Sequence, residues 1–282
     1  MSAEPGRRCA VLGSPIAHSL SPALHRAAYA ELGLDWTYDR FEMAEDGLGP
    51  FVAGCDGAWR GLSLTMPLKV VALALGEVEP LAAQVGAANT LIFDDDGSRR
   101  LHNTDVGGLV WALGRAGVVA VDRATLLGAG ATARSTVVSL SHLGARHLTV
   151  LARTPSRAAP LVQLGASLGV AVTVRGWAVP MPPADVVLNT AVAGAADGLA
   201  EAAAASGPVV FDAIYDPWPT RLASAAEAAG CTVVSGLDLL VGQALLQIEL
   251  MTGRSASAST LESAGRAALD DRQGGLPAVE DC

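Results

Sequence analysis

The chain has 282 residues, of which 51% are hydrophobic and 17% charged, a composition that is typical of a globular protein and excludes a disordered one. A net charge of −9 and a pI of about 5.0 argue against a general nucleic-acid surface. No stretch reaches the roughly 18 apolar residues of a membrane-spanning helix, so we expect neither nucleic acid nor membrane as a partner. The length is sufficient for two domains.

The cysteines and histidines give no sign of a disulfide or a metal site. The four cysteines have neither disulfide nor metal-ligand spacing, and His142 and His147 lie five residues apart with no ligand cluster beside them. The N-terminal residues lack the layout of a signal peptide. We therefore expect reduced cysteines, no bound metal and a cytoplasmic location.

Strands and helices alternate from the beginning of the chain, which predicts an α/β fold. Strands are expected at 8–13, 36–43, 59–66, 91–93 and 99–102, the last two as a hairpin. Helices are expected at about 21–32, 80–85 and 106–116, and a short helix followed by a loop at 45–55. Pro67 predicts the start of one more helix, with Lys69 in its first turn. A surface lysine is the ordinary interpretation, but a helix dipole disfavours an ammonium there, so Lys69 is a better functional candidate than a lysine on an exposed helix face.

Polar residues at two predicted helix starts have both a structural and a functional interpretation. Ser21 is expected to cap its helix, and the local pattern favours this, although Ser19 and Ser21 would also present hydroxyls to a carboxylate. Thr104 or Asp105 is expected to cap the helix at 106–116.

Residues 124–151 predict a strand, a helix and a second strand, which together form a βαβ unit. The turn after the first strand is Gly128-Ala129-Gly130-Ala131-Thr132-Ala133, which fits the dinucleotide pattern G-x-G-x-x-A. Gly128 permits a tight turn, Gly130 allows a pyrophosphate to approach the backbone, and the helix N-terminus attracts phosphate. A loop of small residues is the alternative, but the flanking strands and helix favour a Rossmann-type dinucleotide-binding domain.

The end of the second strand indicates which dinucleotide is bound. Proteins that prefer NAD carry an acidic residue about 20 positions beyond the turn, where it holds the ribose hydroxyl. Here the strand ends in Ala152-Arg153-Thr154, with Arg157 close behind and no carboxylate in reach. Two guanidiniums can bind the 2′-phosphate of the ribose bidentately, so we expect NADP(H) as the cofactor. The alternative is that both arginines are simply solvated at the end of the strand.

The remaining elements continue the alternation to the end of the chain. Helices are expected at 156–168, 220–229 and 238–252, strands at 170–174, 185–188, 209–215 and 231–234, and a proline-rich loop at 179–183. Ligands of parallel sheets bind beyond the carboxyl ends of the strands, where we find Asn189, Thr190, Ala213, Tyr215 and Gly236.

The long helix at 238–252 is expected to pack back on the first domain, with Gln243 and Gln247 four residues apart on one face; exposed glutamines are the ordinary interpretation. Ser259 and Glu262 predict a capping box for a final helix, and residues 273–282 are expected to be frayed.

Laid end to end, these motifs resemble the shikimate dehydrogenase family over nearly the whole chain. The matching segments are 13–22, 63–69, 86–90, 103–105, the glycine-rich turn, 152–157, 212–217 and 236–243. The family pattern is broken in three places: Ser63 replaces an asparagine, the dipeptide Ala131-Thr132 stands for Gly-Ala, and Ala152 replaces an asparagine. None of them removes a reacting group, so we interpret them as tuning.

The resemblance implies two α/β domains with a cleft between them: residues 1–104 with 238–282 would bind substrate, and residues 105–237 would bind NADP. Ser19 and Ser21 would hold a carboxylate. The ring hydroxyls and the reacting carbon of the substrate would be bound by Thr65, Lys69, Asn89, Asp105 and Gln243, and Tyr215 would line the same cleft. The cofactor would contact Gly128, Ala129, Gly130, Ala131, Thr132, Ala152, Arg153, Thr154, Arg157, Asn189, Thr190, Ala213 and Gly236.

The implied reaction is the reversible reduction of 3-dehydroshikimate to shikimate by NADPH, a step towards chorismate and the aromatic amino acids. Lys69 is our candidate for the general acid and base, with Asp105 beside it. Two rival functions are a quinate and shikimate dehydrogenase that uses NAD, and a catalytically silent NADP-binding sensor. Arg153 and Arg157 argue against the first, and the retained Lys69, Asp105 and Gln243 argue against the second. We expect a monomer or a homodimer.

Overall fold

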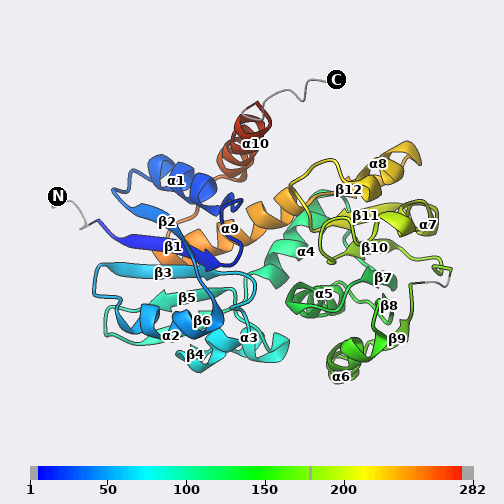
Figure 1. Cartoon of the computed structure of the whole chain (residues 1–282), viewed down its shortest axis with the longest axis horizontal. Coiled ribbons are helices and arrows are strands. Elements are labelled where there is room, and N and C mark those ends of the chain that lie inside the picture. Colours follow the sequence, from blue (N-terminus) through cyan, green and yellow to red (C-terminus); the bar gives the residue numbers. More distant parts are fainter. Residues whose placement is uncertain (1–5, 178–179, 275–282) are drawn as a thin grey trace, which may run out of the picture.

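The computed structural model describes residues 6–177 and 180–274. Two six-stranded sheets lie side by side, each covered by helices, and two further helices run between them (Figure 1). This is the α/β architecture that the alternation of elements predicts.

The first sheet has the strand order β2-β1-β3-β5-β6-β4 and is mixed. Strand β1 pairs in parallel with β2 and β3, whereas β5 runs antiparallel to both β3 and β6 and so forms the predicted hairpin. The strands are β1 (Arg8–Gly13), β2 (Thr37–Glu42), β3 (Trp59–Leu64), β4 (Glu77–Val78), β5 (Thr90–Phe93) and β6 (Arg99–His102). The helices of this half are α1 (Ser21–Glu31), α2 (Glu45–Ala53) and α3 (Pro80–Val85).

The second sheet is parallel throughout, in the order β12-β11-β10-β7-β8-β9. This is the doubly wound order of dinucleotide-binding folds, which reverses between β7 and β10. Its strands are β7 (Arg123–Leu127), β8 (His147–Leu151), β9 (Ala171–Arg175), β10 (Val186–Asn189), β11 (Val209–Asp212) and β12 (Thr232–Val234). Its helices are α5 (Ala131–His142), α6 (Ala159–Ser167), α7 (Ala200–Ser206) and α8 (Arg221–Ala228).

The helices α4 (Asp105–Arg115) and α9 (Gly236–Thr252) lie between the sheets, and α10 (Ala258–Gly274) follows (Figure 1). The two helices cross very closely: a Cβ on Gly108 would lie 2.6 Å from the Gln243 backbone nitrogen, and one on Gly242 would lie 2.6 Å from the Gly108 oxygen. Only residues without a Cβ allow this crossing. The prediction that 238–252 packs on the first half is confirmed, because Leu240, Val241, Ala244 and Ile248 share a core cluster with Leu20, Leu24 and Ala28.

The predicted helix after Pro67 is wrong. Residues 66–70 form a turn, and only a short 3-10 helix, Val71–Ala74, follows. The Lys69 carbonyl accepts a hydrogen bond from the Ala88 nitrogen at 2.8 Å, so a contact with a distant segment replaces the helical bond. Lys69 therefore does not lie at a helix N-terminus, and the dipole argument does not apply to it.

Three predicted caps also differ. Ser21 is the first helical residue of α1 and makes no side-chain cap, and Thr104 precedes α4 but its hydroxyl bonds Asn89 instead. The final helix begins at Ala258, and Ser257, not Ser259, accepts from the Thr260 nitrogen.

Thr220 caps α8 as its place in the sequence predicts, and α9 carries a capping box of Ser235 and Asp238 that the sequence analysis does not include. The sequence also missed β4 and α7, and the strand predicted at 209–215 ends at Asp212. The predictions for residue 179 and for 275–282 fall outside the described residues. Within residues 6–177 and 180–274, no helix is both long and apolar enough to span a membrane.

Candidate active site between the two sheets

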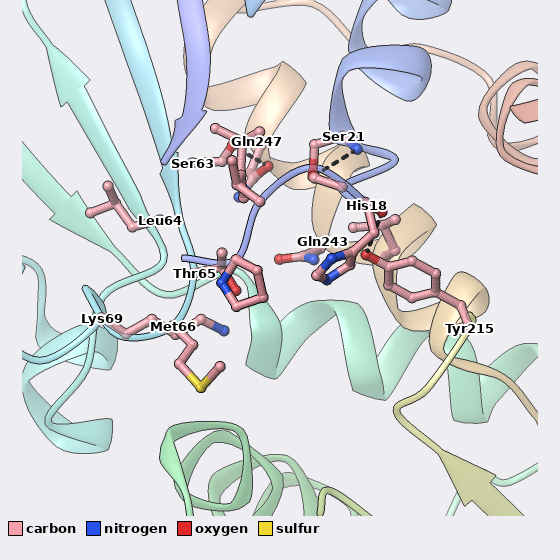
Figure 2. Close-up of a pocket in the computed structure, with 15 residues that line it drawn as sticks. His18, Ser21, Ser63, Leu64, Thr65, Met66, Lys69, Tyr215, Gln243 and Gln247 are labelled. Atoms are coloured by element: carbon pink, nitrogen blue, oxygen red, sulfur yellow. Dashed lines mark hydrogen bonds between the residues drawn. The ribbon is translucent and has the colours of Figure 1, made fainter. Parts of the chain in front are cut away.

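A cavity of about 190 Å³ opens where the carboxyl ends of β1 and β3 meet the loop after β11. Figure 2 shows Lys69 and Thr65 on one side of this space and Tyr215 on the other. Six of the predicted substrate-binding residues line it, namely Ser19, Ser21, Thr65, Lys69, Tyr215 and Gln243. His18, Ser63 and Gln247 also line it, and the sequence analysis gave them no role at the site.

Lys69 and Asp105 form a close ion pair, with 2.6 Å between Nζ and Oδ2. The side chains are 12% and 3% exposed, so water screens the pair only weakly. The Asn89 amide nitrogen lies 2.9 Å from the other Asp105 oxygen and 2.8 Å from Gln243 Oε1. Asn89 and Asp105 thus stand directly behind the cavity lining and orient Lys69 and Gln243.

Backbone hydrogen bonds bring these distant residues together. The Leu64 nitrogen donates to the Asn89 oxygen at 2.7 Å, and the Asn89 nitrogen donates to the His102 oxygen at 3.0 Å. The segment before α4 is therefore anchored to the sheet beside Lys69. Asp105 is the first residue of α4, which places its carboxylate next to that anchor.

Lys69 is the only lysine in the chain: the other 18 of its 19 lysine and arginine residues are arginines. A guanidinium cannot give up its proton in a protein, whereas an ammonium can. The one position where the chain uses lysine lines the cavity next to a buried carboxylate. This count is readable from the sequence and singles out Lys69 without any motif.

A buried polar network forms the floor of the cavity. Ser63 donates to Gln247 Oε1 at 2.8 Å and accepts from the Tyr38 hydroxyl at 2.6 Å, and Gln247 donates to the Thr90 hydroxyl at 3.0 Å. Gln247 is 3% exposed, so the expectation of an exposed glutamine was wrong. Its members come from three strands, β2, β3 and β5, and from helix α9, which are far apart in sequence.

His25 ends this network, with Nε2 at 3.2 Å from Gln247 Oε1. The side chain is completely buried, and burial lowers the pKa of His25 from 6.5 to about 3. His25 is therefore neutral at pH 7, with its Nε2–H donated to the glutamine.

The opposite wall comes from the dinucleotide side of the molecule. The Tyr215 hydroxyl lies 3.5 Å from the His18 carbonyl oxygen (Figure 2). Burial raises the pKa of the Tyr215 phenol, which stays protonated and can donate a hydrogen bond. The Ser21 nitrogen donates to the Ser19 hydroxyl at 3.3 Å, so both serines are held in one turn beside α1.

The glycine-rich turn has the geometry that a bound phosphate requires. Gly128 has a φ of +107°, and a Cβ on it would lie 2.9 Å from the Thr190 hydroxyl. A Cβ on Gly130 would meet no heavy atom within 4 Å, and α5 begins at the next residue. The space over Gly130 is open at a helix N-terminus, which fits an anionic group.

Arg153, Thr154 and Arg157 follow β8 and are exposed, whereas Ala152 is buried. The pairing of Leu127 with Leu151 puts the end of β8 beside the glycine-rich turn. Neither arginine forms an ion pair with the part of the chain that is described, and the Arg153 guanidinium lies 5.9 Å from the centre of the Trp177 ring. Both cations are available to an anion at this edge.

The other predicted cofactor residues lie along the same edge. The Asn189 amide donates to Asp212 at 3.0 Å and its oxygen accepts from the Ala191 nitrogen, so this side chain is committed to the sheet. The Thr190 hydroxyl donates to the Leu127 oxygen at 3.0 Å. Gly236 packs directly on the backbone of Ala213, where no Cβ would fit. Among the described residues, no group of three or more His, Cys, Asp or Glu side chains could hold a metal ion.

The chain is similar to known proteins over nearly all of its length. The family model described as the shikimate dehydrogenase substrate binding domain matches residues 11–91. A curated relative from Moorella thermoacetica, a shikimate dehydrogenase (NADP(+)), is 35% identical over 94% of this chain and 95% of its own length. The chain belongs to the shikimate dehydrogenase family.

Solved structures of the shikimate dehydrogenase family share the fold. The enzyme of Mycobacterium tuberculosis is 44% identical with a TM-score of 0.86, over 93% of this chain and 99% of that one. The shikimate 5-dehydrogenase of Thermus thermophilus, solved in complex with NADP(H) and shikimate, is 33% identical with a TM-score of 0.80, over 93% and 99% of the two chains.

The three departures from the shikimate dehydrogenase motifs have distinct surroundings. Ser63 lies in β3, as the predicted strand at 59–66 implies, and its hydroxyl is shared between Tyr38 and Gln247. Ala131 and Thr132 are the first residues of α5, half-buried at its open end. Ala152 is 4% exposed, and because alanine has no polar side-chain atom, this position offers no side-chain donor to a ligand.

Proposed function

We propose that this protein is an NADP-dependent shikimate dehydrogenase, which interconverts 3-dehydroshikimate and shikimate. The observation that carries the proposal is the chain's single lysine, held 2.6 Å from the Asp105 carboxylate in the lining of a cavity. Family membership over most of the chain and the ligands of the Thermus thermophilus relative support it.

In this proposal, the substrate-binding domain comprises residues 1–104 and 238–282. Ser19 and Ser21 bind the substrate carboxylate, for which two hydroxyls in one turn are suitable donors. The ring hydroxyls are bound by Thr65 and Gln243 in a cleft that Tyr215 also lines, and Asn89 and Asp105 support these contacts from directly behind the lining. The Asn89–Gln243 contact of 2.8 Å fixes the glutamine before the ligand arrives.

The cofactor half comprises residues 105–237. The diphosphate binds over the turn from Gly128 to Thr132, where the space above Gly130 is open. Arg153 and Arg157 bind the 2′-phosphate, with Ala152 and Thr154 beside them, and Asn189, Thr190, Ala213 and Gly236 contribute mainly backbone contacts. NADPH, when bound, supplies the hydride for the carbonyl carbon.

Lys69 moves the proton. In the direction of reduction, its Nζ donates a proton to the substrate carbonyl oxygen, which becomes a hydroxyl, and the resulting amine recovers a proton from water. In the direction of oxidation, the neutral amine accepts the proton of that hydroxyl. Asp105 holds Nζ in place in both directions, and Asn89 holds the second oxygen of Asp105.

Replacement of Lys69 tests the proposal. We expect Lys69→Met to lower kcat about 10²- to 10⁴-fold, measured by NADPH absorbance, with a much smaller change in KM for shikimate. Lys69→Arg is the matched control for charge, because it keeps a cation beside Asp105 but cannot release a proton. It should be nearly as slow as Lys69→Met.

Three outcomes would contradict this assignment. Unchanged turnover in either variant would remove Lys69 from the proton transfer. Wild-type protein that turns over quinate with NAD faster than shikimate with NADP would be the rival dehydrogenase. Wild-type protein that binds NADP and turns over neither substrate would be a silent sensor.

A further inference from the structure

The C-terminal helix α10 reaches the mouth of the cavity through one side chain. Arg272 Nη1 donates to the His18 carbonyl oxygen at 2.8 Å and to Asp216 Oδ2 at 3.3 Å, and its Nη2 donates to the Ser19 carbonyl oxygen at 3.3 Å. The Arg272 and Asp216 side chains are 30% and 37% exposed, so the cluster lies partly below the surface.

These contacts join three segments that are far apart in sequence. His18 and Ser19 belong to the turn that carries the hydroxyls of Ser19 and Ser21. Asp216 directly follows Tyr215, whose hydroxyl lies 3.5 Å from the same His18 oxygen that Arg272 binds. The guanidinium thus ties the serine turn to the wall on the dinucleotide side.

We propose that Arg272 is a positioning residue that fixes the serine turn against the Tyr215 loop and thereby sets the affinity for the carboxylate end of the substrate. The proposal rests on the proposed function. The serine turn offers hydroxyls to an anion, while two carbonyl oxygens and the Asp216 carboxylate gather behind it. A cation at that point offsets this negative charge in a chain whose net charge is −9.

The planar guanidinium is necessary for this arrangement, because it directs two nitrogens at three oxygen acceptors at once. Without the guanidinium, the serine turn loses its attachment to the Tyr215 loop on the opposite wall. The proton-transferring pair is untouched, since in the described chain Arg272 forms no hydrogen bond with Lys69 or Asp105. Binding should therefore change more than the chemical step.

The test compares Arg272→Gln with Arg266→Gln in the full-length protein, with kcat and KM measured for shikimate and for NADP. Arg266 is the matched control, because it is an exposed arginine on the same helix. We expect Arg272→Gln to raise KM for shikimate about tenfold, with kcat changed less than about threefold and KM for NADP unchanged. Arg266→Gln should behave as wild type.

Two results would overturn the proposal: an unchanged KM for shikimate in Arg272→Gln, or a fall in kcat as large as the change in KM. Arg272→Met keeps the aliphatic stem without the donors and gives the same readout if the glutamine variant does not fold. An inactive wild-type protein would instead refute the proposed function, so the two failures are distinguishable.

Discussion

The Lys69 amine pairs with the Asp105 carboxylate, which is almost completely removed from water. Replacement of one partner would leave the other charge buried and unpaired, so the pair must be considered as one unit. Asn89 belongs to the same unit, because its amide contacts both Asp105 and Gln243.

Arg153 is the residue at which the choice between NADP and NAD can be tested. We expect Arg153→Ser to raise KM for NADP about 10- to 100-fold, because a charge-assisted contact with the 2′-phosphate is lost, and to change KM for NAD little. The measurement is the ratio of kcat/KM for the two cofactors. Arg146→Ser is the control, since Arg146 precedes β8 at its other end and pairs with Asp122. An unchanged ratio in Arg153→Ser would place the 2′-phosphate elsewhere.

His25 makes the stability of the protein depend on pH. Burial lowers the pKa of His25 in the folded state to about 3, below the unfolded value of 6.5. Its contribution to the free energy of unfolding is complete above pH 6.5 and is lost as the pH falls towards 3, by about 1.4 kcal/mol per pH unit. Between pH 7.5 and pH 5 the loss from this residue is about 2 kcal/mol.

Urea unfolding of His25→Asn checks this value, because asparagine keeps an N–H donor for Gln247 but does not titrate. The variant should show a shallower fall of unfolding free energy between pH 6.5 and pH 4 than wild type. The exposed His147, replaced by asparagine, is the control. Identical slopes for wild type and His25→Asn would show that folding does not lower the pKa of His25.

Among the elements, the crossing of α4 and α9 determines the geometry of the site, because one helix carries Asp105 and the other carries Gln243. The two side chains are linked through Asn89. A change in the distance between the helices therefore moves the carboxylate that holds Lys69 relative to Gln243, the proposed substrate-binding side chain of α9.

We expect Gly108→Ala to lower the free energy of unfolding by about 1–3 kcal/mol and to lower kcat/KM for shikimate, because the new methyl would collide with the Gln243 backbone. Gly114→Ala, in the same helix but with no atom within 4 Å of its Cβ, should instead stabilise the protein by up to about 1 kcal/mol. Equal effects of the two substitutions would mean that the helices adjust their separation freely.

Elements with local signals could be predicted from sequence, and elements that depend on distant contacts could not. The strand at 147–151 has the predicted bounds, because its β-rich run is isolated by a glycine and by Pro155. The helix expected after Pro67 failed because Ala88, a residue of a later segment, binds the Lys69 carbonyl. The expectation of an exposed Gln247 failed for the same reason, because its hydrogen-bond partners Ser63 and Thr90 are far from it in sequence.

For the site, family-like motifs named six residues of the cavity, whereas Tyr38 and Gln247 of the floor network, and Arg272, lie outside every motif. The roles of these residues depend on which segments contact one another, and only the folded chain shows those contacts.

At the scale of the whole molecule, the proposed cofactor and substrate sites lie on different sheets and share the space between them. Ligand binding should therefore stabilise the complete fold. We expect NADP at 100 times its Kd to add about 2.7 kcal/mol to the free energy of unfolding, and thermal unfolding with and without NADP measures this. In Arg153→Ser the same NADP concentration should give a clearly smaller rise in Tm; an equal rise would contradict the assigned cofactor edge.

The single lysine has a practical consequence. The chain contains one ε-amine, which is 12% exposed and paired with Asp105, so a reagent that modifies any lysine side chain of this protein must modify the one in the cavity lining. A lysine-specific protease would cut the unfolded chain only between Lys69 and Val70, and an acyl group on Lys69 would block that cut, so the uncut fraction would report how much reagent had reached the cavity.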